Sequence, residues 1–368
     1  MKTLSAILYA PGERLKIEEV EILPPQSGEV QVRMHASGVC HSDLHVMKGD
    51  SPMKMPIILG HEGAGVIESV GEGVTSVQPG DHVVPIWRMS CGLCEYCLSG
   101  RPALCDVGTK MRFTGLMPDG KTRFYTEKGD PIHHYAGVST FSQLSTMPEG
   151  AVVKIDPDFS LQQAALISCG VITGFGAVFA SAKVPPASSV AVFGAGGIGL
   201  NIIQSARLAG ATQIIAVDTF ASKQPYAEKL GATDFINAAE TDAVEEIMKR
   251  TDGKGVDFAF EAIGIAKTVE QAYDAVKKGG TCVVVGIAGP EARSKININA
   301  LVYAEKTLKG SIYGSTRPRI DLPKLMELSR SGKLELEPLL TKTYPLTEIN
   351  EAYEALEKGE VARSLIIP

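Results

Sequence analysis

Residues 189–199 read Ser189-Val190-Ala191-Val192-Phe193-Gly194-Ala195-Gly196-Gly197-Ile198-Gly199, an apolar run followed by the pattern G-x-G-x-x-G. The run predicts a strand, and the apolar spacing of Gly199–Ala209 predicts a helix directly after it. Glycines let the backbone turn tightly and approach a pyrophosphate, to which a helix N-terminus offers free N–H groups and a positive dipole end. The segment therefore predicts a dinucleotide site, with candidate contacts at Gly194, Gly196, Gly197 and Gly199.

An acidic residue follows at the end of the next predicted strand, Gln213–Val217. Asp218 lies 24 residues after Gly194, where a carboxylate can accept hydrogen bonds from the ribose hydroxyls. Because it would also repel a 2′-phosphate, it favours NAD over NADP. Lys223, five residues further, is a second candidate contact for this ribose. The alternative is a tight strand-to-helix turn with a solvated aspartate.

Strands and helices alternate on the C-terminal side of this segment. Further strands are predicted at Asp234–Ile236, Val256–Glu261, Thr281–Gly286 and Thr307–Tyr313, and helices at Gln224–Leu230, Ala243–Arg250 and Ala266–Lys277. This alternation predicts a doubly wound α/β domain, in which helices cover both faces of a parallel sheet.

The chain has a different character before residue 170. Short β-type runs such as Gln31–Ala36, Gly65–Val70 and His82–Ile86 are separated by Gly, Pro and charged turns, which predicts a small β-rich unit. The tail beyond residue 315 holds two helical segments and a strand-like run, at Leu322–Ser329, Ile349–Lys358 and Ser364–Ile367. A length of 368 residues suits two domains.

Composition limits the possible partners. The formal net charge of −6 gives no global attraction for nucleic acid or an anionic membrane. Apolar stretches such as Val190–Ile203 are too short and too rich in glycine to predict a membrane span. The N-terminal run Ala6–Ala10 is not a signal-peptide core, because Pro11 and the residues after it interrupt it. We therefore expect a cytoplasmic protein with a small-molecule substrate.

Four of the seven cysteines lie in one window, as Cys91-x2-Cys94-x2-Cys97-x7-Cys105. Such short spacings are cramped for disulfides but suit a tetrahedral zinc ion held by four thiolates. Four protein ligands close the coordination shell, so this zinc would be structural. A redox cluster or a disulfide pair is the alternative. Cys282 lies in a predicted strand, where we expect a buried side chain with no chemical role.

Three further residues have the types that hold a catalytic zinc ion, with one open position. They are Cys40, His61 and Cys169. Their separation in the sequence does not by itself make them a set, since isolated His and Cys residues are more often part of a core.

The stretch Gly60-His61-Glu62-x2-Gly65-x5-Gly71-x2-Val74 resembles the signature of the medium-chain zinc-dependent alcohol dehydrogenases. The cysteine window, the glycine loop and the segments Leu166–Gly170 and Arg363–Ile367 follow in the order of that family. The resemblance implies a GroES-like β-rich catalytic domain formed by residues 1–170 and 313–368, with a zinc lobe at about 88–110. A Rossmann NAD-binding domain would occupy residues 171–312. Phe113–Phe141 resembles the longer dimeric branch, which includes glutathione-linked formaldehyde dehydrogenases, and implies a homodimer joined edge to edge.

The resemblance also implies roles for individual residues. Cys40, His61 and Cys169 would bind a catalytic zinc ion, the second of two per chain, which polarises the substrate oxygen. Asp43 would orient His61, and Glu62 would lie behind the metal or serve as a buried ion-pair partner.

Five further roles follow from the same resemblance. Ser42 would receive the alcohol proton and His45 would pass it to solvent. The alternative roles are a turn hydroxyl for Ser42 and an exposed polar residue for His45. His41 and Arg363 would contact the NAD pyrophosphate, and Ile198 would pack behind the nicotinamide.

Trp87, the only tryptophan, occupies a position that walls the substrate channel in relatives. A large indole there would narrow the pocket or stack on an aromatic substrate; the alternative is a core residue that anchors the zinc lobe. His133 and His134 are expected to serve packing rather than metal binding.

The leading hypothesis is an NAD-dependent zinc alcohol dehydrogenase of EC 1.1.1 type that converts a primary, aryl or alkyl alcohol to the aldehyde or ketone. A thiol-linked formaldehyde dehydrogenase, acting on the glutathione or mycothiol adduct, is the close alternative. It would need a basic pocket, for which Arg88, Lys110 and Arg112 are candidates. A non-catalytic protein that binds NAD and zinc is the third hypothesis, and the intact ligand set argues against it.

Overall fold

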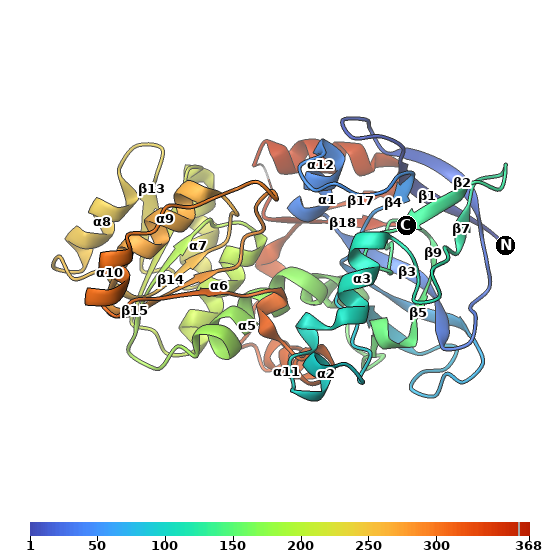
Figure 1. Ribbon diagram of the computed structural model, residues 1–368, viewed down its shortest axis with the longest axis horizontal. Helices are drawn as coiled ribbons and strands as arrows, with labels where there is room; N and C mark the ends of the chain where they lie inside the picture. Colours follow the sequence, from blue (N-terminus) through green and yellow to red (C-terminus); the bar gives the residue numbers. More distant parts are fainter. Residues whose placement is uncertain (360) are drawn as a thin grey trace. The chain divides into compact units, whose positions relative to one another are not determined.

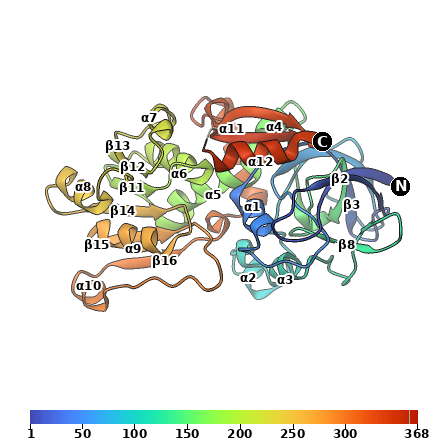
Figure 2. The same cartoon turned by 90° about the horizontal axis from the view of Figure 1, so that it is seen from above.

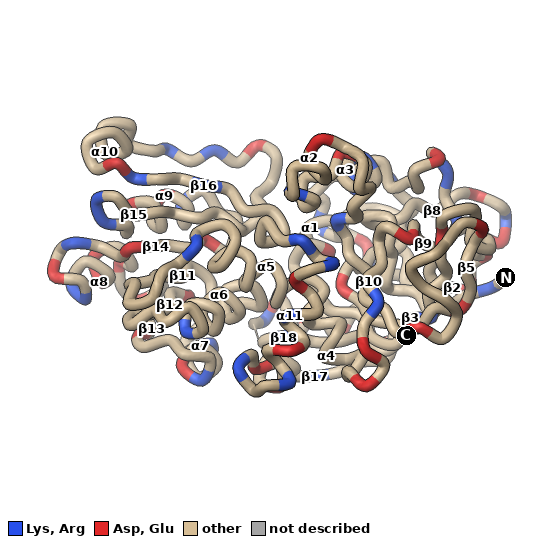
Figure 3. The backbone as a smooth tube through the Cα atoms, turned by 90° about the horizontal axis from the view of Figure 1, so that it is seen from below, with Lys and Arg blue, Asp and Glu red and all other residues tan. Residues whose placement is uncertain are grey.

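A computed structural model describes residues 1–359 and 361–368 and divides the chain into two compact units (Figure 1). The first contains Met1–Cys169, Arg317–Glu327 and Leu340–Pro368, and the second contains Gly170–Thr316 and Leu328–Leu339. These bounds differ from the expected domains in the tail, because residues 313–316 and 328–339 group with the second unit. Acidic and basic residues are interspersed along both units (Figure 3).

The first unit is built from strands, as its short β-type runs predict. A closed barrel contains β1 (Lys2–Leu8), β2 (Lys16–Ile22), β7 (Phe124–Tyr125), β8 (Pro131–His134) and β4 (Ile57–Ile58). A second sheet has the order β10 (Val152–Lys154), β6 (His82–Pro85), β5 (Gly63–Val70), β3 (Glu29–Gly38), β18 (Arg363–Ile367) and β17 (Leu340–Pro345), and β9 (Leu144–Pro148) also pairs with β3.

Helices are few in this unit and include those that carry the candidate chemistry. They are α1 (His41–Lys48), α2 (Glu95–Leu98), α3 (Asp106–Thr114), α4 (Leu161–Leu166), α12 (Ile349–Glu357) and most of α11 (Pro318–Arg330). The C-terminal tail returns to this unit, because Leu365 and Ile366 of β18 pair with Gly38 and Ser37 of β3. Strand β3 ends at Gly38, two residues before Cys40, so this pairing supports the site described below.

The second unit has the expected parallel sheet, with the order β13 (Asp234–Asn237), β12 (Gln213–Asp218), β11 (Ser189–Phe193), β14 (Val256–Glu261), β15 (Val276–Val284) and β16 (Thr307–Gly310) (Figure 2). Its helices are α5 (Ile172–Gly176), α6 (Gly197–Leu208), α7 (Gln224–Leu230), α8 (Ala243–Arg250), α9 (Ala266–Ala275) and α10 (Ile298–Tyr303). Short 3-10 turns of the two units lie at Pro102–Leu104, Glu149–Ala151, Ala221–Lys223, Tyr313–Ser315, Glu337–Leu339 and Leu346–Glu348.

Strand alternation places helices on both faces of this sheet. Ala191 and Phe193 of β11 pack in one cluster with residues of α8 and α9, whereas the side chain of Val192 lies beside Gly199 of α6. Because neighbouring residues of a strand point to opposite faces, α6 and the pair α8–α9 cover opposite sides. The doubly wound fold predicted from the sequence is therefore confirmed. Several predicted bounds are wrong: the predicted helix to Lys277 ends at Ala275, the predicted strand Thr281–Gly286 ends at Val284 as part of β15, and the predicted strand to Tyr313 ends at Gly310.

One helical segment, Leu161–Ala182, was overlooked in the sequence. It contains α4 and α5 with the π-helical stretch Ile167–Val171 between them, and it ends with a second such stretch, Ala177–Ala182, after α5. Its 22 residues are long and apolar enough to span a membrane. Since most of the segment is buried by the protein itself, it has the environment of a core helix.

Candidate functional site

Four buried side chains from three parts of the first unit meet at one point. Cys40 precedes α1, His61 and Glu62 precede β5, and Cys169 lies in the π-helical stretch Ile167–Val171. Their candidate ligand atoms all lie within 4.8 Å of one another, and Cys169 Sγ is 3.5 Å from His61 Nε2. The structure thus brings together the three predicted zinc ligands and adds Glu62. The π-helical stretch at Cys169 agrees with the frequent occurrence of such distortions at functional sites.

Asp43 holds the His61 ring from behind. Its Oδ1 accepts a hydrogen bond from the Gly60 backbone N–H at 3.0 Å and lies 3.2 Å from His61 Nδ1. Burial alone would lower the pKa of His61, but the charges of Asp43 and Cys40 outweigh it and raise that pKa to about 10. The carboxylate at Nδ1 leaves Nε2 directed at the sulfur of Cys169, which is the arrangement that a metal-binding histidine requires.

The two thiols of the cluster share a hydrogen bond. Contact with Cys169 lowers the pKa of Cys40, and the same contact raises the pKa of Cys169. A thiolate, an imidazole nitrogen and a second thiol therefore meet in one buried place. This donor set suits zinc.

Glu62 completes the cluster as a buried carboxylate. Its Oε2 forms an ion pair with Arg363, whereas its Oε1 has no hydrogen-bond partner among the described residues and lies 3.9 Å from His61 Nε2. An unpartnered buried carboxylate oxygen beside two cysteines and a histidine fits a bound cation. Arg363, for which the resemblance implies a phosphate contact, is itself 6% exposed and pairs with Glu62.

Trp87 lies beside this cluster. The centroids of its ring and of the His61 ring are 5.9 Å apart, at an interplanar angle of 81°. The contact with Cys40 and burial raise the pKa of Cys169, and a hydrogen bond from Trp87 partly offsets this rise. The side chain is 8% exposed. An aromatic face therefore stands next to the candidate metal ligands.

Helix α1 carries the candidate proton relay. Ser42 and His45 are half-buried and His41 is exposed. Residues three apart lie on one side of a helix, which puts Ser42 and His45 on the same side. His45 Nδ1 lies 3.2 Å from Asp50 Oδ2, so a carboxylate stands next to the candidate base.

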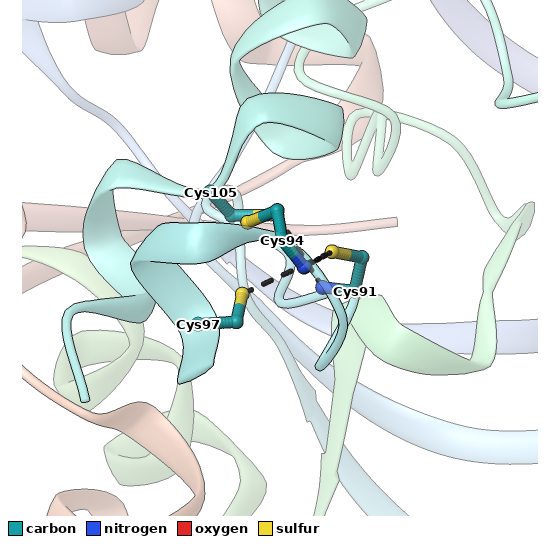
Figure 4. A group of neighbouring side chains, drawn as sticks. All are labelled: Cys91, Cys94, Cys97 and Cys105. Atoms are coloured by element: carbon teal, nitrogen blue, oxygen red, sulfur yellow. Dashed lines mark hydrogen bonds between the residues drawn. The ribbon is translucent and has the colours of Figure 1, made fainter. Parts of the chain in front are cut away.

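The second cluster is the four-cysteine lobe, shown in Figure 4. The four sulfur atoms lie within 4.8 Å of one another, and all seven cysteines of the chain are free thiols in the structure, which contradicts a disulfide pair. Backbone N–H groups point at the sulfurs, from Cys94 to Cys91 and from Cys91 to Cys105, both at 3.3 Å. Backbone hydrogen bonds lower the pKa of Cys94 to about 6, and burial raises that of Cys105 to about 12. Donors aimed at sulfur stabilise thiolates, and four clustered cysteine sulfur atoms fit a structural zinc ion.

The glycine loop of the second unit has the geometry of a phosphate-binding turn. Gly194 has a φ of +95°, and a Cβ at Gly199 would lie 1.7 Å from the Gly194 carbonyl oxygen, so only glycine allows this approach. A Cβ at Gly196 would have no heavy atom within 4 Å, which leaves space outside the turn. Helix α6 begins at Gly197 without a side-chain cap in the described structure, so its N-terminal N–H groups remain available to an anion.

Asp218 lies against this loop. It accepts hydrogen bonds from the backbone N–H of Ala195 at 2.7 Å and of Phe220 at 3.0 Å. Lys223 is nearby and 7% exposed; its burial lowers the pKa, and Asp218 counteracts this effect. Ile198, the predicted nicotinamide neighbour, is half-buried. The predicted cofactor residues of this unit are thus gathered around one turn.

The remaining histidine and cysteine of interest have structural surroundings. His134 Nε2 accepts a hydrogen bond from the Arg123 backbone N–H at 3.1 Å, and burial lowers the pKa of His134 to about 3. His133 Nδ1 lies 3.1 Å from the Pro56 carbonyl oxygen. Cys282 is fully buried, which raises its pKa to about 12. These contacts agree with packing roles.

Tyr135 was not recognised in the sequence. Its ring stands edge-on to His61, with centroids 5.6 Å apart, and its hydroxyl donates to the Ser42 carbonyl oxygen at 3.2 Å. The residue follows β8, far from either partner along the chain, and although it lies within Phe113–Phe141, no pattern in that segment singles it out. Only the tertiary fold reveals the contact.

Comparison with known proteins agrees with both units. The family model described as the alcohol dehydrogenase GroES-like domain matches residues 26–157, and the one described as zinc-binding dehydrogenase matches residues 197–331. The chain is 42% identical over 369 aligned residues to S-(hydroxymethyl)glutathione dehydrogenase of Escherichia coli O1:K1 / APEC, with 100% of both chains covered.

Two solved structures are similar over the whole chain. One is an alcohol dehydrogenase zinc-binding domain protein from Burkholderia ambifaria, with a TM-score of 0.95 and 36% identity over 100% of this chain and 99% of that one. The other is benzyl alcohol dehydrogenase from Acinetobacter calcoaceticus, with a TM-score of 0.94, 34% identity and the same coverage. The chain therefore belongs to the medium-chain zinc-dependent alcohol dehydrogenases and is an oxidoreductase of EC 1.1.1 type, with zinc and NAD as its cofactors.

Proposed function

We propose that this enzyme oxidises free primary alcohols to aldehydes, and that alcohols with an aromatic ring next to the hydroxymethyl group are its best substrates. The observation that carries this proposal is the contact between Trp87 and His61, with ring centroids 5.9 Å apart. A flat indole beside a metal ligand favours an aromatic substrate, because offset or edge-on ring contacts add to the gain from burying the ring.

The basic residues next to the four-cysteine lobe support the same choice. Arg88 is 7% exposed and donates to the Ala103 carbonyl oxygen at 2.9 Å and to Thr109 Oγ1 at 2.8 Å. Arg112 donates to Tyr135 Oη at 3.0 Å. Both guanidinium groups are thus engaged inside the protein, whereas a thiol adduct with free carboxylates needs cations that face the substrate. Lys110, which is exposed on α3, is the remaining candidate for that role.

We assign the chemistry as follows. Cys40, His61 and Cys169 would hold the catalytic zinc ion, which supplies a Lewis acid for the substrate oxygen. Asp43 keeps His61 oriented, and Ser42 accepts the alcohol proton and passes it toward His45. Gly194–Gly199 and Asp218 would hold the NAD pyrophosphate and ribose, and Cys91, Cys94, Cys97 and Cys105 would hold a structural zinc ion.

A thiol-linked formaldehyde dehydrogenase is the second candidate. The relatives from Escherichia coli that are named S-(hydroxymethyl)glutathione dehydrogenase, at 42% identity over the full chain, favour it. The two candidates share their cofactors and differ only in the part of the pocket that receives the rest of the substrate.

We also propose a homodimer joined along β16. This strand is the edge of its sheet, and its four residues are all exposed. Helix α10 nearby presents Ile298, Val302 and Tyr303 with exposed fractions of 72%, 65% and 84%. An open edge strand next to exposed apolar side chains is typical of a surface that a second copy covers. The cytoplasmic location stays a prediction.

The decisive experiment measures NADH formation by the purified enzyme with benzyl alcohol, ethanol, and formaldehyde with and without glutathione. We expect the highest kcat/KM with benzyl alcohol, and loss of activity on zinc removal. In Trp87→Ala, the ratio of kcat/KM for benzyl alcohol to that for ethanol should fall about tenfold, which corresponds to one aromatic pair contact. Turnover only with formaldehyde and glutathione, reduced in Lys110→Ala, would instead establish the second candidate. A zinc-loaded enzyme without any turnover would favour the non-catalytic hypothesis.

A further inference from the structure

The helix that carries the candidate relay begins without a side-chain cap among the residues that the structure describes. Its N-cap residue is Cys40, whose sulfur belongs to the metal cluster, so the thiol cannot serve the helix terminus as Ser, Thr or Asp would. The first turn of α1, which contains Ser42, therefore needs support from elsewhere. The position of the Ser42 hydroxyl depends on how firmly this turn is held.

Tyr135 fastens this turn in a different way, through a backbone carbonyl oxygen rather than through the N–H groups that a cap would bind. Its hydroxyl donates to the Ser42 backbone carbonyl oxygen at 3.2 Å, and its ring packs edge-on against His61 at 5.6 Å. The side chain is 1% exposed. One rigid aromatic group thus contacts both a metal ligand and the peptide of the relay serine, and it sets the distance between them.

Arg112 in turn holds Tyr135. Its Nη2 donates to Tyr135 Oη at 3.0 Å, and its guanidinium carbon lies 4.4 Å from the centroid of the Tyr135 ring, within the range of a cation–π contact. With Arg112 as donor to the oxygen, the hydroxyl hydrogen of Tyr135 is directed to Ser42. Arg112 lies on α3, the helix that starts directly after Cys105. The four-cysteine lobe is thereby connected to α1 through two side chains.

From this geometry we infer that Tyr135 and Arg112 are positioning residues for proton transfer, acting through the backbone of Ser42. This inference rests on the proposed function, in which Ser42 accepts the alcohol proton. Neither residue needs to touch the reacting atoms. Their role is to keep the Ser42 hydroxyl in place while the substrate alcohol loses its proton.

The test compares Tyr135→Phe, which keeps the ring against His61, with Tyr125→Phe, which removes a half-exposed phenol from β7 of the same unit. For Tyr135→Phe we expect kcat for alcohol oxidation to fall about threefold to tenfold, the factor for one neutral hydrogen bond. The pH dependence of kcat should change, while KM for the alcohol and the zinc content stay within twofold of the parent enzyme. Arg112→Ala should act in the same direction, and Arg112→Lys should restore part of the loss. Tyr125→Phe should leave all of these unchanged.

A cycle with Ser42→Ala separates this inference from the proposed relay. If Tyr135 acts through Ser42, then Tyr135→Phe should change kcat by less than twofold in the Ser42→Ala background. An equal loss in both backgrounds, or no loss in either, would overturn the positioning role while the relay stands. If Ser42→Ala itself leaves kcat and its pH dependence unchanged, the relay is wrong, and the positioning role is overturned with it.

Discussion

The same substitution at two glycines of the NAD loop should impair two different properties. Alanine at position 199 should lower the stability of the fold, and alanine at position 196 should weaken cofactor binding. In Gly199→Ala, the new Cβ would lie 1.7 Å from the carbonyl oxygen of Gly194 and 2.8 Å from its carbon. Real Cβ atoms stay at least 3.0 Å from such neighbours, so loop and helix must separate by about 1.3 Å, the difference between 3.0 and 1.7 Å. Both sides of the clash are backbone, and no rotamer change relieves it. We expect a loss of about 2–3 kcal/mol of folding free energy, and a Tm that is lower by about 5–10 °C.

Gly196→Ala is the matched control for this clash. A Cβ at Gly196 meets nothing within 4 Å, and its φ of −84° suits alanine. Its stability without cofactor should therefore stay within about 0.5 kcal/mol of the parent. The methyl group would instead occupy the approach of the pyrophosphate, and NADH should bind at least about tenfold more weakly.

Thermal unfolding with and without NAD⁺, together with an NADH titration followed by fluorescence, measures both effects. If Gly199→Ala unfolds at the parent temperature, the loop and the helix do not depend on this close approach. If Gly196→Ala binds NADH with parent affinity, the open space at Gly196 does not receive the cofactor.

Three further predictions concern stability, pH and assembly. Glu29→Gln should lower the unfolding free energy by about 3 kcal/mol in urea titrations. Arg123 is 2% exposed and bonded to Glu29 at 2.6 Å, so its buried positive charge would then face a neutral amide in place of a carboxylate. An unchanged midpoint of urea unfolding would contradict this prediction. His134, with its pKa lowered from 6.5 to about 3, binds a proton only in the unfolded chain when the pH lies between these two values. The unfolding free energy should therefore fall by about 2 kcal/mol from pH 6.5 to 5. His134→Gln should remove this pH dependence, and a pH dependence that persists in the variant would assign it to another group. In the proposed dimer, Val302→Glu should give monomers in analytical ultracentrifugation. If the variant remains a dimer with the dissociation constant of the parent, the α10 surface is not part of the dimer interface.

The sequence was informative wherever local pattern and tertiary structure agree. The strand Ser189–Phe193 and the helix Ala243–Arg250 have the bounds expected from their apolar spacing. The prediction was wrong at Val276 and Lys277, which continue a helical pattern but lie in β15. There Val276 pairs with Val256 of the neighbouring strand, so the sheet overrides the local preference.

Some residues of the candidate site could be predicted from the sequence, and others are revealed only by the tertiary structure. Cys40, His61 and Cys169 could be selected through the family resemblance, because their residue types and order are specific. Arg88 and Arg112 were expected to be candidates for a substrate pocket, and only the structure reveals that both bond to groups inside the protein. Tyr135 carried no signal, since its importance arises from contacts with His61 and Ser42, which are distant along the chain.

The bond between Asp218 and the Ala195 N–H, at 2.7 Å, has a consequence for attempts to change the coenzyme. The carboxylate that would discriminate against a 2′-phosphate also fastens the turn that would receive the pyrophosphate. Replacing Asp218 by a small neutral residue to admit NADP would therefore loosen the phosphate-binding turn for either coenzyme. A successful exchange needs a second substitution that supplies a new acceptor for the Ala195 N–H, so coenzyme preference in this enzyme should change by paired steps rather than single ones.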